Sequence, residues 1–380
     1  MISLDTSLAD CPPTAAGKRH QAYAERAGRL TIVTYTPPGY QRPPSSACLT
    51  VIPTNSRSRL TYALDAYRLA RQVEPVDLIT TQDPFVTGLV GLWLRRTLHA
   101  PLLVQNHSHY FGNKAWLDER PLRYRLFALL GKFIVQRADM YRTVNRRERE
   151  AYLAMGGSPE RVAVLPLMTV SEQFAQDVAL DVKQAKREQL GLQPHHKVVL
   201  WVGRAVKTKR LPLLLQVFQR VAEREPDARL LLVGDLSPAN IPEMARELGI
   251  VDRVIMPGKV AHDDLPVYYW LSDVLAITSA YEGMPRVLGE AAIAGRPIVG
   301  MDSAVGVVEF IEDGVTGYLC PDGDLAYMAS RIVALLQDGD LAARVGTAAR
   351  ARALAALQGP SNAEAVVALW EKAVQMGMRC

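Results

Sequence analysis

The sequence predicts two α/β domains in tandem, each built around a parallel sheet, and three observations support this. Short apolar runs alternate with longer helical patterns along the chain, which is typical of repeated βαβ units. The same pattern restarts near Lys197. The chain has 380 residues, whereas a single hydrophobic core rarely grows beyond about 250–300 residues. Two domains therefore fit the length better than one.

The first half contains six predicted strands. Many of them are continuous apolar runs, as expected when helices cover both faces of a sheet. The strands are 30–35, 49–53, 77–81, 102–105, 140–144 and 162–165. Helical patterns fill the longer intervals at 59–71, 84–98 and 122–137.

The second half repeats this order. Its predicted strands are 198–202, 229–233, 254–256, 274–278, 297–300 and 317–319. Its predicted helices are 212–224, 241–248, 287–294 and 325–337. Weak periodicity over 169–181 predicts the linker, so we expect domains at 1–175 and 182–358. A final helix within 360–380 is expected to pack back on the first domain.

The composition places the chain among ordinary globular proteins. Its 49% hydrophobic and 22% charged residues exclude a disordered or collagen-like chain. The net charge of +5 is unevenly spread. Residues 1–180 carry 22 basic and 15 acidic side chains, a net of +7, and residues 181–380 carry 22 and 24, a net of −2. A basic first half favours an anionic partner, but this excess does not indicate nucleic acid.

The sequence shows neither a membrane-spanning stretch nor the pattern of a signal peptide. The longest markedly apolar stretch, 85–94, is far shorter than the ~20 residues that cross a bilayer. The first residues lack the basic segment and apolar core of a signal peptide, so we expect a cytoplasmic protein. The cysteines lack Cys-x-x-Cys spacing and are expected to be reduced thiols; they are Cys11, Cys48, Cys320 and Cys380.

The most informative string follows the predicted strand 274–278 and runs from Ser279 to Glu290. Pro285 suits the start of a helix, so Glu282 precedes that helix and Glu290 lies on its second turn. The amides of Arg286, Val287 and Leu288 at the helix start are expected to be unpaired and able to bind phosphate. Carboxylates accept hydrogen bonds from sugar hydroxyls. The string therefore favours a nucleotide-sugar diphosphate. The alternative is an amphipathic helix with Glu290 in solvent and Glu282 in a turn.

A second string follows the predicted strand 198–202. Gly203 permits a tight turn, and Arg204 with Lys209 supplies two cations that suit a diphosphate. A solvated basic loop explains this segment equally well. Neither the dinucleotide-binding glycine fingerprint nor a P-loop motif is present in the sequence.

Together these strings resemble the retaining glycosyltransferases of family 4. The resemblance rests on Gly203-Arg204 with Lys209, and on Glu282-Gly283 with Glu290 eight positions later. Matching pieces occur at 231–235, 257–260 and 309–317. It covers most of 195–350, and over 1–170 it rests mainly on Gln105-Asn-His107 and the alternating pattern.

The resemblance implies the GT-B architecture, in which two Rossmann-like domains face a central cleft and the second holds the donor. It implies catalytic roles for His107, Arg204, Lys209 and Glu282: the two cations hold the departing diphosphate, Glu282 binds a hydroxyl of the donor sugar, and His107 approaches that sugar. Glu290 would bind the ribose and the backbone at 259–260 the base. The two strings and the resemblance together give these donor-binding residues: Gly203, Gly234, Lys259, Val260, Gly283, Met284, Pro285, Arg286, Val287, Leu288 and Glu290.

No metal or cofactor is expected, because members of the family are metal-independent. Two Asp-x-Asp strings, at 322–324 and 338–340, resemble the metal motif of other transferases. Each precedes a helical Leu-Ala run, where Asp is favoured as an N-cap. We therefore interpret them as caps.

The sequence departs from the family pattern in three places. Residues 14–20 hold a single glycine where members have a glycine-rich turn, and the segments 166–170 and 302–306 also differ. Acceptor contacts are consequently less well predicted than donor contacts. The candidates on the acceptor side are Gly17, Arg19 and His109.

The basic excess of the first half peaks between Arg120 and Arg149, with Leu122, Leu126, Leu129, Leu130 and Phe133 among the cations. One interpretation is a core helix with a solvated basic face. The other is peripheral contact with anionic lipid at the inner face of a membrane, together with a lipid-linked or small anionic acceptor.

The resemblance thus implies transfer of a hexose from a nucleoside diphosphate sugar, first of all a UDP-sugar, to a hydroxyl acceptor. Three alternatives stay open: a GDP-mannose-type donor at the same site, a nucleotide-sugar epimerase, and a catalytically silent protein that binds nucleotide sugars for a partner enzyme.

Overall fold

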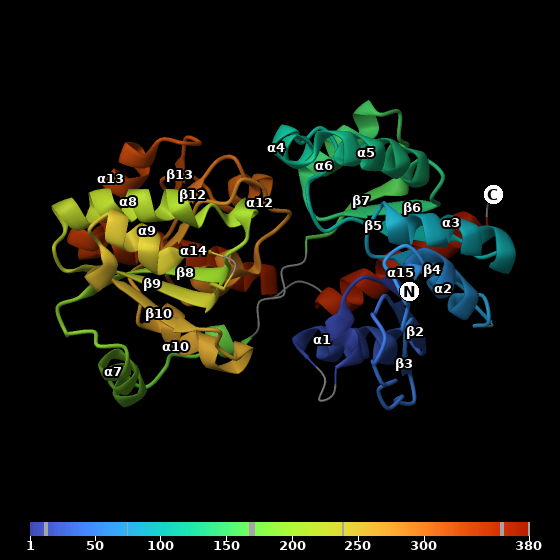
Figure 1. The fold of residues 1–380 in the computed structure, drawn as a ribbon, viewed down its shortest axis with the longest axis horizontal. Coiled ribbons are helices and arrows are strands. Elements are labelled where there is room, and N and C mark those ends of the chain that lie inside the picture. Colours follow the sequence, from blue (N-terminus) through green and yellow to red (C-terminus); the bar gives the residue numbers. More distant parts are fainter. Residues whose placement is uncertain (11–13, 74, 167–171, 238, 358–360, 379–380) are drawn as a thin grey trace. The chain divides into compact units, whose positions relative to one another are not determined.

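The computed structural model of the chain describes all residues except 11–13, 74, 167–171, 238, 358–360 and 379–380. It divides into two compact units (Figure 1). The N-terminal unit comprises 1–167 together with 360–380, and the C-terminal unit comprises 168–359. Each unit is an α/β layer structure around one parallel sheet.

The N-terminal sheet has the order β3-β2-β1-β4-β5-β6-β7, and its strand pairs are parallel. Its short central strand β1, which the periodicity did not predict, lies between β2 and β4. The strands are β1 (Ile2–Ser3), β2 (Leu30–Thr34), β3 (Leu49–Pro53), β4 (Ile79–Thr81), β5 (Leu102–Gln105), β6 (Met140–Thr143) and β7 (Val162–Val164).

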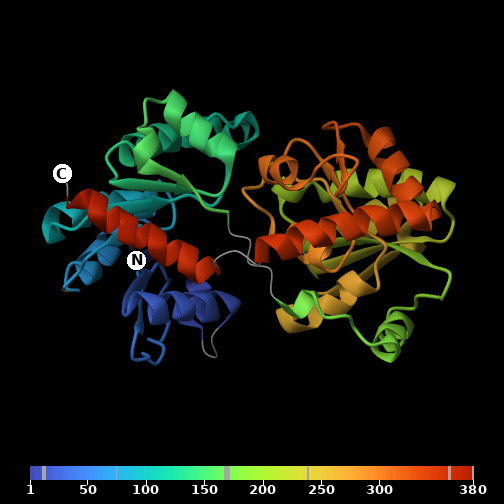
Figure 2. The ribbon, with the colours of Figure 1, turned by 180° about the vertical axis from the view of Figure 1, so that it is seen from behind.

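Helices cover both faces of this sheet because its buried strands alternate apolar side chains between two cores. In β5, Leu102 and Val104 pack toward α2, α3 and α5, while Leu103 packs toward α1 and α15. Helix α15 lies beside α1 in this unit (Figure 2). The helices are α1 (Ala15–Ala27), α2 (Tyr62–Ala70), α3 (Val86–Leu98), α4 (Lys114–Glu119), α5 (Pro121–Val135), α6 (Arg146–Ala154) and α15 (Asn362–Gly377), with 3-10 turns η1 (Thr6–Ala9) and η2 (Pro159–Arg161).

The C-terminal sheet has the order β10-β9-β8-β11-β12-β13, again with parallel pairs. This is the strand order of a Rossmann fold, in which ligands bind where the order reverses, here between β8 and β11. The strands are β8 (Lys197–Arg204), β9 (Ala228–Asp235), β10 (Val254–Gly258), β11 (Val274–Ile277), β12 (Ile298–Met301) and β13 (Tyr318–Cys320).

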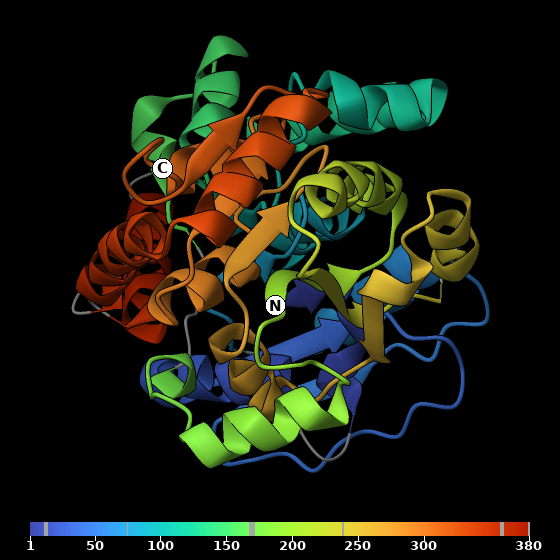
Figure 3. The same ribbon diagram turned by 90° about the vertical axis from the view of Figure 1, so that its left-hand side faces the viewer.

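Two cores flank this sheet as well. Val199 and Trp201 of β8 pack toward α8, α9 and α13, while Val198 and Leu200 pack toward α10, α11 and α14. Figure 3 shows α8 and α14 on opposite sides of the strands. The helices are α7 (Leu180–Gln189), α8 (Leu211–Arg224), α9 (Ile241–Glu247), α10 (Leu265–Trp270), α11 (Arg286–Ile293), α12 (Val305–Phe310), α13 (Leu325–Gln337) and α14 (Gly339–Leu357), with 3-10 turns η3 (Glu172–Phe174), η4 (Lys207–Lys209), η5 (Val251–Arg253) and η6 (His262–Asp264).

The domain boundary differs from the expected one at residue 175. Phe174 is fully buried in the C-terminal core, with its ring centroid 5.5 Å from that of Tyr269. Because Phe174 packs in this core, it belongs to the C-terminal unit. The boundary between the two units therefore lies after residue 167. Part of the expected linker, 169–171, lies outside the described residues, and α7 begins within the rest.

Among the described residues no helix is both long enough and apolar enough to cross a membrane. Two of the cysteines, Cys48 and Cys320, are free thiols. Cys11 and Cys380 lie outside the described residues.

Candidate functional site

The predicted donor residues lie at the carboxyl ends of four neighbouring strands in the C-terminal unit. Gly203 and Arg204 end β8, and Gly234 lies near the end of β9. Lys259 and Val260 follow β10, and the loop 278–285 follows β11. Because β10, β9, β8 and β11 are adjacent, the fold brings these segments to one edge of the sheet. That edge includes the point where the strand order reverses.

An ion pair joins the two strings singled out in the sequence. Lys209 Nζ, on η4 after β8, donates to Glu282 Oε1, in the loop after β11, and the side chains are only 21% and 17% exposed. The backbones are joined too: the Ala280 amide donates to Thr208 O at 2.8 Å, and Thr278 Oγ1 donates to Lys209 O at 3.0 Å. A cation and a carboxylate are thus held next to each other between two strand ends.

Arg210, which is not among the residues predicted from the sequence, holds the same loops in place. Its Nε donates to Thr278 O at 2.5 Å and its Nη2 to Ser303 Oγ at 2.7 Å. Nη2 also lies 2.7 Å from Asp322 Oδ1. The backbone of Arg210 is left-handed, with φ 49°, a conformation costly for a non-glycine residue. These contacts hold the residue there, and only its position after Lys209 could have indicated it.

Gly234 and Gly306 must be glycines, because the backbone of another segment lies too close to each of them for a side chain. Gly203 and Gly234 face each other in register on β8 and β9, and a Cβ on Gly234 would lie 1.8 Å from Gly203 O. A Cβ on Gly306, at the start of α12, would lie 2.5 Å from Gly283 O. The Gly306 amide donates to Glu282 O at 3.2 Å. The backbone around Gly283 is therefore packed tightly against α12.

Helix α11 begins at Arg286, directly after this loop. Pro285 takes the N-cap position, and its side chain supplies no capping hydrogen bond. The Leu288 amide donates to Pro285 O at 3.2 Å. Leu288 is therefore not free to bind a phosphate, contrary to the expectation, and the predicted amide donors reduce to Arg286 and Val287. Met284 packs partly buried against the core under α11.

Glu290 is buried on α11, not solvated. It is 3% exposed; Tyr269 donates its hydroxyl to Glu290 Oε2 at 2.7 Å, and His262 Nε2 lies 3.5 Å from Oε1. Burial and the Glu290 carboxylate raise the pKa of Tyr269 well above its ordinary value. The structure therefore contradicts the solvent-exposed alternative. Tyr269 and His262 are partners that the sequence did not reveal.

Arg204 differs from Lys209 because its side chain is exposed. Asp235, at the end of β9, lies within its electrostatic reach. Hydrogen bonds from Ser237, with smaller contributions from Arg204 and Lys259, lower the pKa of Asp235. The exposed cations Arg204 and Lys259 thus lie near one another, around the half-buried carboxylate of Asp235.

In the N-terminal unit, His107 follows β5 and is half-buried. Its Nε2 lies 2.5 Å from Gln82 Oε1, and its Nδ1 is buried without a hydrogen-bond partner among the described residues. Burial, followed by the charges of Arg142 and Arg19, lowers the pKa of His107 to about 3. The imidazole is therefore neutral at pH 7.

Arg142 is the source of much of that positive field. It is 2% exposed on β6, where Nη1 donates to Gln105 Oε1 at 2.5 Å and Nη2 to Leu165 O at 3.0 Å. Burial lowers the pKa of Arg142 to about 10. The guanidinium is held by neutral acceptors, so its charge acts on His107 without local compensation.

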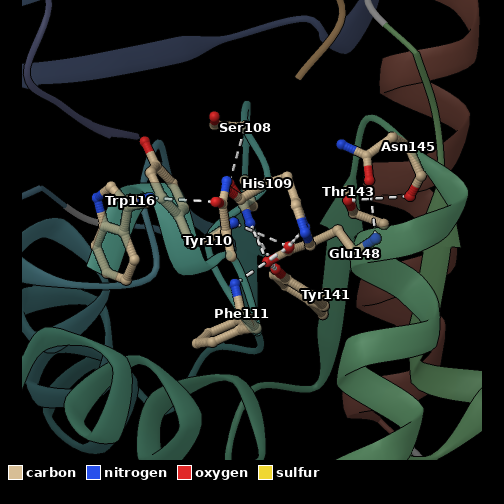
Figure 4. A network of polar contacts seen from close by, with 11 residues as sticks. Ser108, His109, Tyr110, Phe111, Trp116, Tyr141, Thr143, Asn145 and Glu148 are labelled. Atoms are coloured by element: carbon tan, nitrogen blue, oxygen red, sulfur yellow. Dashed lines mark hydrogen bonds and ion pairs between the residues drawn. The ribbon is translucent and has the colours of Figure 1, made fainter. Parts of the chain in front are cut away.

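His109 belongs to a buried network around Glu148 (Figure 4). Its Nδ1 lies 2.8 Å from Glu148 Oε2, which also accepts the Tyr110 amide at 3.0 Å. Glu148 Oε1 accepts from Asn106 Nδ2 at 2.6 Å and from the Tyr141 hydroxyl at 3.0 Å. The network fixes the loop after β5, so His109 is a buried positioning residue, whereas we expected an acceptor contact. The polar sequence of α6 gave no signal that Glu148 is buried.

The remaining acceptor-side candidates lie on α1. Thr14 caps this helix, and the Gly17 amide donates to Thr14 Oγ1 at 3.3 Å. Gly17 is therefore part of the first helical turn. Arg19 is half-buried on the next turn and is one of the charges that lower the pKa of His107, which indicates that these two side chains are near each other.

The Asp-x-Asp strings cap helices. Asp324 caps α13 through the Tyr327 amide at 2.9 Å, as predicted. Helix α14 starts earlier than expected, so Asp338 rather than Asp340 accepts from the Leu341 amide, at 2.9 Å. In the part of the chain that the structure describes, no group of three or more His, Cys, Asp and Glu side chains is arranged to hold a metal ion.

Two protein families match the chain in consecutive segments. Residues 18–168 match the family described as glycosyl transferase 4-like domain, and residues 182–352 match glycosyl transferases group 1. The second match contains the predicted donor residues, and the first contains His107.

Curated proteins match the chain over part of their length. N-acetyl-alpha-D-glucosaminyl L-malate synthase of Bacillus anthracis is 34% identical over 171 residues, 45% of this chain and 44% of that protein. Alpha-D-kanosaminyltransferase of Streptomyces kanamyceticus is 29% identical over 262 residues, with coverages of 66% and 65%. D-inositol 3-phosphate glycosyltransferase of Mycobacterium sp. (strain KMS) is 31% identical over 272 residues, with coverages of 67% and 58%. The chain thus spans about half to two thirds of these relatives.

Solved structures share the fold along the whole chain. HepE of Anabaena in complex with UDP-glucose superposes with a TM-score of 0.74 at 20% identity, covering 100% of this chain and 99% of that one. WaaG, a glycosyltransferase involved in lipopolysaccharide biosynthesis, gives 0.73 at 15%, covering 99% and 98%. The two family matches, the curated relatives and the common fold together show that the chain belongs to glycosyltransferase family 4 and has the GT-B architecture.

Proposed function

We propose that this protein is a retaining, metal-independent glycosyltransferase that moves a hexose from a nucleoside diphosphate sugar to a hydroxyl acceptor. The observation that carries the proposal is the Lys209–Glu282 ion pair at the point where the strand order of the C-terminal sheet reverses. A cation for a diphosphate and a carboxylate for a sugar hydroxyl are adjacent there, as the two halves of one donor require.

Departure of the nucleoside diphosphate is the step that these residues serve. As the bond between the anomeric carbon and the β-phosphate oxygen breaks, negative charge accumulates on the diphosphate. Lys209 and Arg204 would stabilise that charge together with the Arg286 and Val287 amides at the start of α11. Lys209 is held in place by its partner and its backbone contacts, so little reorganisation is needed.

The transfer that we propose retains the configuration of the anomeric carbon. The acceptor oxygen bonds to the anomeric carbon on the face that the diphosphate leaves, and its proton passes to the departing phosphate. Glu282 would hold a hydroxyl of the donor sugar. His107, neutral because its pKa is lowered to about 3, would contribute a hydrogen bond to that sugar rather than a positive charge.

A UDP-sugar is the donor that we propose first. HepE, which has the same fold, is described in complex with UDP-glucose. A GDP-sugar is the alternative, since a GDP-mannose-dependent phosphatidylinositol monomannoside mannosyltransferase of Mycolicibacterium smegmatis is 28% identical over 276 residues, 70% of this chain and 69% of that protein. Lys259 and Val260 would meet either base through their backbone atoms, which leaves both donors compatible with the site.

For the acceptor we propose a hydroxyl compound that carries an anionic group, either small or lipid-linked. Relatives are named for D-inositol 3-phosphate and for L-malate. The cations Arg19 and Arg142 lie near His107 in this chain, and residues 1–180 carry the net charge of +7 (22 basic minus 15 acidic).

The test is a donor screen with and without acceptors. UDP-glucose, UDP-N-acetylglucosamine and GDP-mannose are each incubated with the protein and an anionic polyol, with EDTA present in parallel, and nucleotide release is followed. UDP or GDP should also raise the melting temperature of the folded protein, and the product's anomeric coupling reports retention. Binding without turnover would favour the silent nucleotide-sugar-binding partner instead, and loss of turnover in EDTA would contradict metal independence.

A further inference from the structure

Helix α5 presents a row of large apolar side chains to solvent. Leu122 is 87% exposed, Leu126 64%, Leu129 68% and Phe133 46%. Their spacing of four, three and four residues places them within about 60° of one another around a helix of 3.6 residues per turn. They therefore form one apolar stripe, about 17 Å long at 1.5 Å per residue. We call these four residues the α5 stripe.

The inner face of α5 has its own partners, so the stripe is not needed to build the core. Gly131, Ile134 and Val135 are buried, and Leu130 packs against the same core. A Cβ on Gly131 would lie 2.9 Å from Phe85 Cε1, which shows how closely this side is packed. The helix lies beside α3 and α4 in the N-terminal unit (Figure 1).

Aromatic contacts also attach α5 to the rest of the N-terminal unit. Trp116 of α4 stacks on Tyr124 of α5, with ring centroids 4.7 Å apart and planes 7° apart. Phe85 stacks on Trp116 at 5.6 Å and on Phe127 at 5.4 Å. Helix α5 is therefore fixed to the unit along the side opposite the stripe.

Cations border the stripe on both sides. At about 100° per residue, Arg123 lies on one side of it and Arg125 and Lys132 on the other. Arg120 and Arg137 stand beyond its two ends, and Arg137 lies 3.7 Å from the centroid of the Phe133 ring. The sequence from Arg120 to Arg137 holds five basic residues and no acidic residue.

We propose that the α5 stripe docks the protein on an anionic lipid surface, with α5 parallel to the membrane plane. Leucine and phenylalanine would enter the boundary between headgroups and acyl chains, while the flanking arginines and the lysine meet lipid phosphates. A second copy of this chain is a poorer occupant. Two-fold packing of identical stripes would place these cations against their own copies.

Vesicle flotation tests the proposal and requires no substrate, so its result is independent of the proposed transfer reaction. The full chain is mixed with vesicles of phosphatidylcholine alone, or of phosphatidylcholine with phosphatidylglycerol, at low and high salt. We expect binding to the anionic vesicles, weaker binding to the neutral ones, and partial release by salt.

The decisive variant is Leu126→Gln with Leu129→Gln, which changes two exposed side chains. It should lower the vesicle partition coefficient at least about tenfold, because two buried leucines are lost from the lipid boundary. Leu60→Gln is the matched control, since Leu60 is 94% exposed elsewhere in the same unit and should leave partition unchanged. Far-UV circular dichroism verifies that both variants are folded.

Two results would overturn the proposal: no binding of the unmodified chain to anionic vesicles, or equal partition of the double variant and the unmodified chain. Light scattering adds a third. A dimer that dissociates in the double variant would assign the stripe to self-association.

Discussion

The two units share a strand order at their centre but use polar side chains in opposite ways. In the C-terminal unit, Lys209 and Glu282 are paired at strand ends and keep part of their surface exposed. In the N-terminal unit, Glu148 and Arg142 are almost fully buried and hold other residues in place. One unit thus keeps paired charges partly exposed at its strand ends. The other uses buried charge to shape the loop after β5 and, in addition to the burial of His107 itself, to lower the pKa of that imidazole. A common fold does not imply a common use of its strand ends.

The largest effect that follows from this contrast is on stability in the N-terminal unit. Glu148→Ala removes the acceptor for Asn106, Tyr141 and the Tyr110 amide, so it should cost about 3–5 kcal/mol of unfolding free energy. Urea unfolding measures the loss, and amide hydrogen exchange should place it in the N-terminal unit.

Glu150→Ala on the same helix is the matched control, since Glu150 is exposed. If Glu148→Ala fails to fold, Glu148→Gln retains the volume but turns an amide donor toward other donors. Stability unchanged in Glu148→Gln would contradict the structural role of this carboxylate.

The sequence predicted the strands well, because continuous apolar runs such as 102–105 and 198–202 are buried on both faces. Among the elements that it missed are the two-residue strand β1 and the polar helix α6, whose charged sequence hides a single buried face carrying Glu148 and Tyr152. Periodicity is a weak signal for elements that are this short or this polar.

The same physical difference explains which site residues could be predicted. Lys209 and Glu282 lie in two contiguous strings that the family resemblance marks, and these strings follow β8 and β11, which are neighbours in the sheet. The contacts of His107 with Gln82 and of Glu290 with Tyr269 join residues 25 and 21 positions apart. No local pattern marks such pairs, and the fold alone brings them together.

The next largest effect belongs to the C-terminal unit and concerns binding. Lys209→Ala should weaken donor or nucleotide affinity by roughly 1.5–3 kcal/mol, about ten- to hundredfold, because it removes a charged hydrogen-bond donor. Calorimetric titration with the nucleotide that binds the unmodified chain measures the change in affinity. Lys207→Ala, which alters an exposed lysine on the same turn η4, should retain the affinity. Equal affinities in the two variants would contradict the assignment of Lys209 to the diphosphate.

The third prediction concerns the free energy of unfolding of the N-terminal unit at acid pH, and the expected change is smaller. His20 is 5% exposed on α1, and burial, the main cause, lowers its pKa to about 4. In the unfolded chain a histidine titrates near 6.5, so the unfolded chain binds more protons between pH 6.5 and 4. Stability therefore falls as the pH decreases through this range, by about 1.6 kcal/mol between pH 6.5 and 5 for His20 alone.

Chemical unfolding of His20→Asn across this pH range measures the contribution. The variant should lose less stability on acidification than the unmodified chain, whatever its stability at pH 7. His195→Asn is the control, because His195 of the C-terminal unit is 60% exposed. An unchanged pH slope in His20→Asn would show that other groups govern the acid sensitivity of the N-terminal unit.

The smallest predicted effect tests whether the last helix belongs energetically to the N-terminal unit. Ser361 caps α15 by accepting from the Glu364 amide at 3.2 Å, while its own amide donates to Glu364 Oε2 at 2.8 Å. Helix α15 buries Val366, Val367 and Trp370 in the N-terminal core. Ser361→Ala should therefore lower the free energy of unfolding by about 1 kcal/mol, the usual effect of losing an N-cap.

Hydrogen exchange should detect this loss in β2 and β5, which α15 covers, but not in β8 or β11. Ser45→Ala, at an exposed position, should leave both units unchanged. Faster exchange in β8 after Ser361→Ala would mean that the two units unfold together and that their contrast in polar side chains has no counterpart in stability.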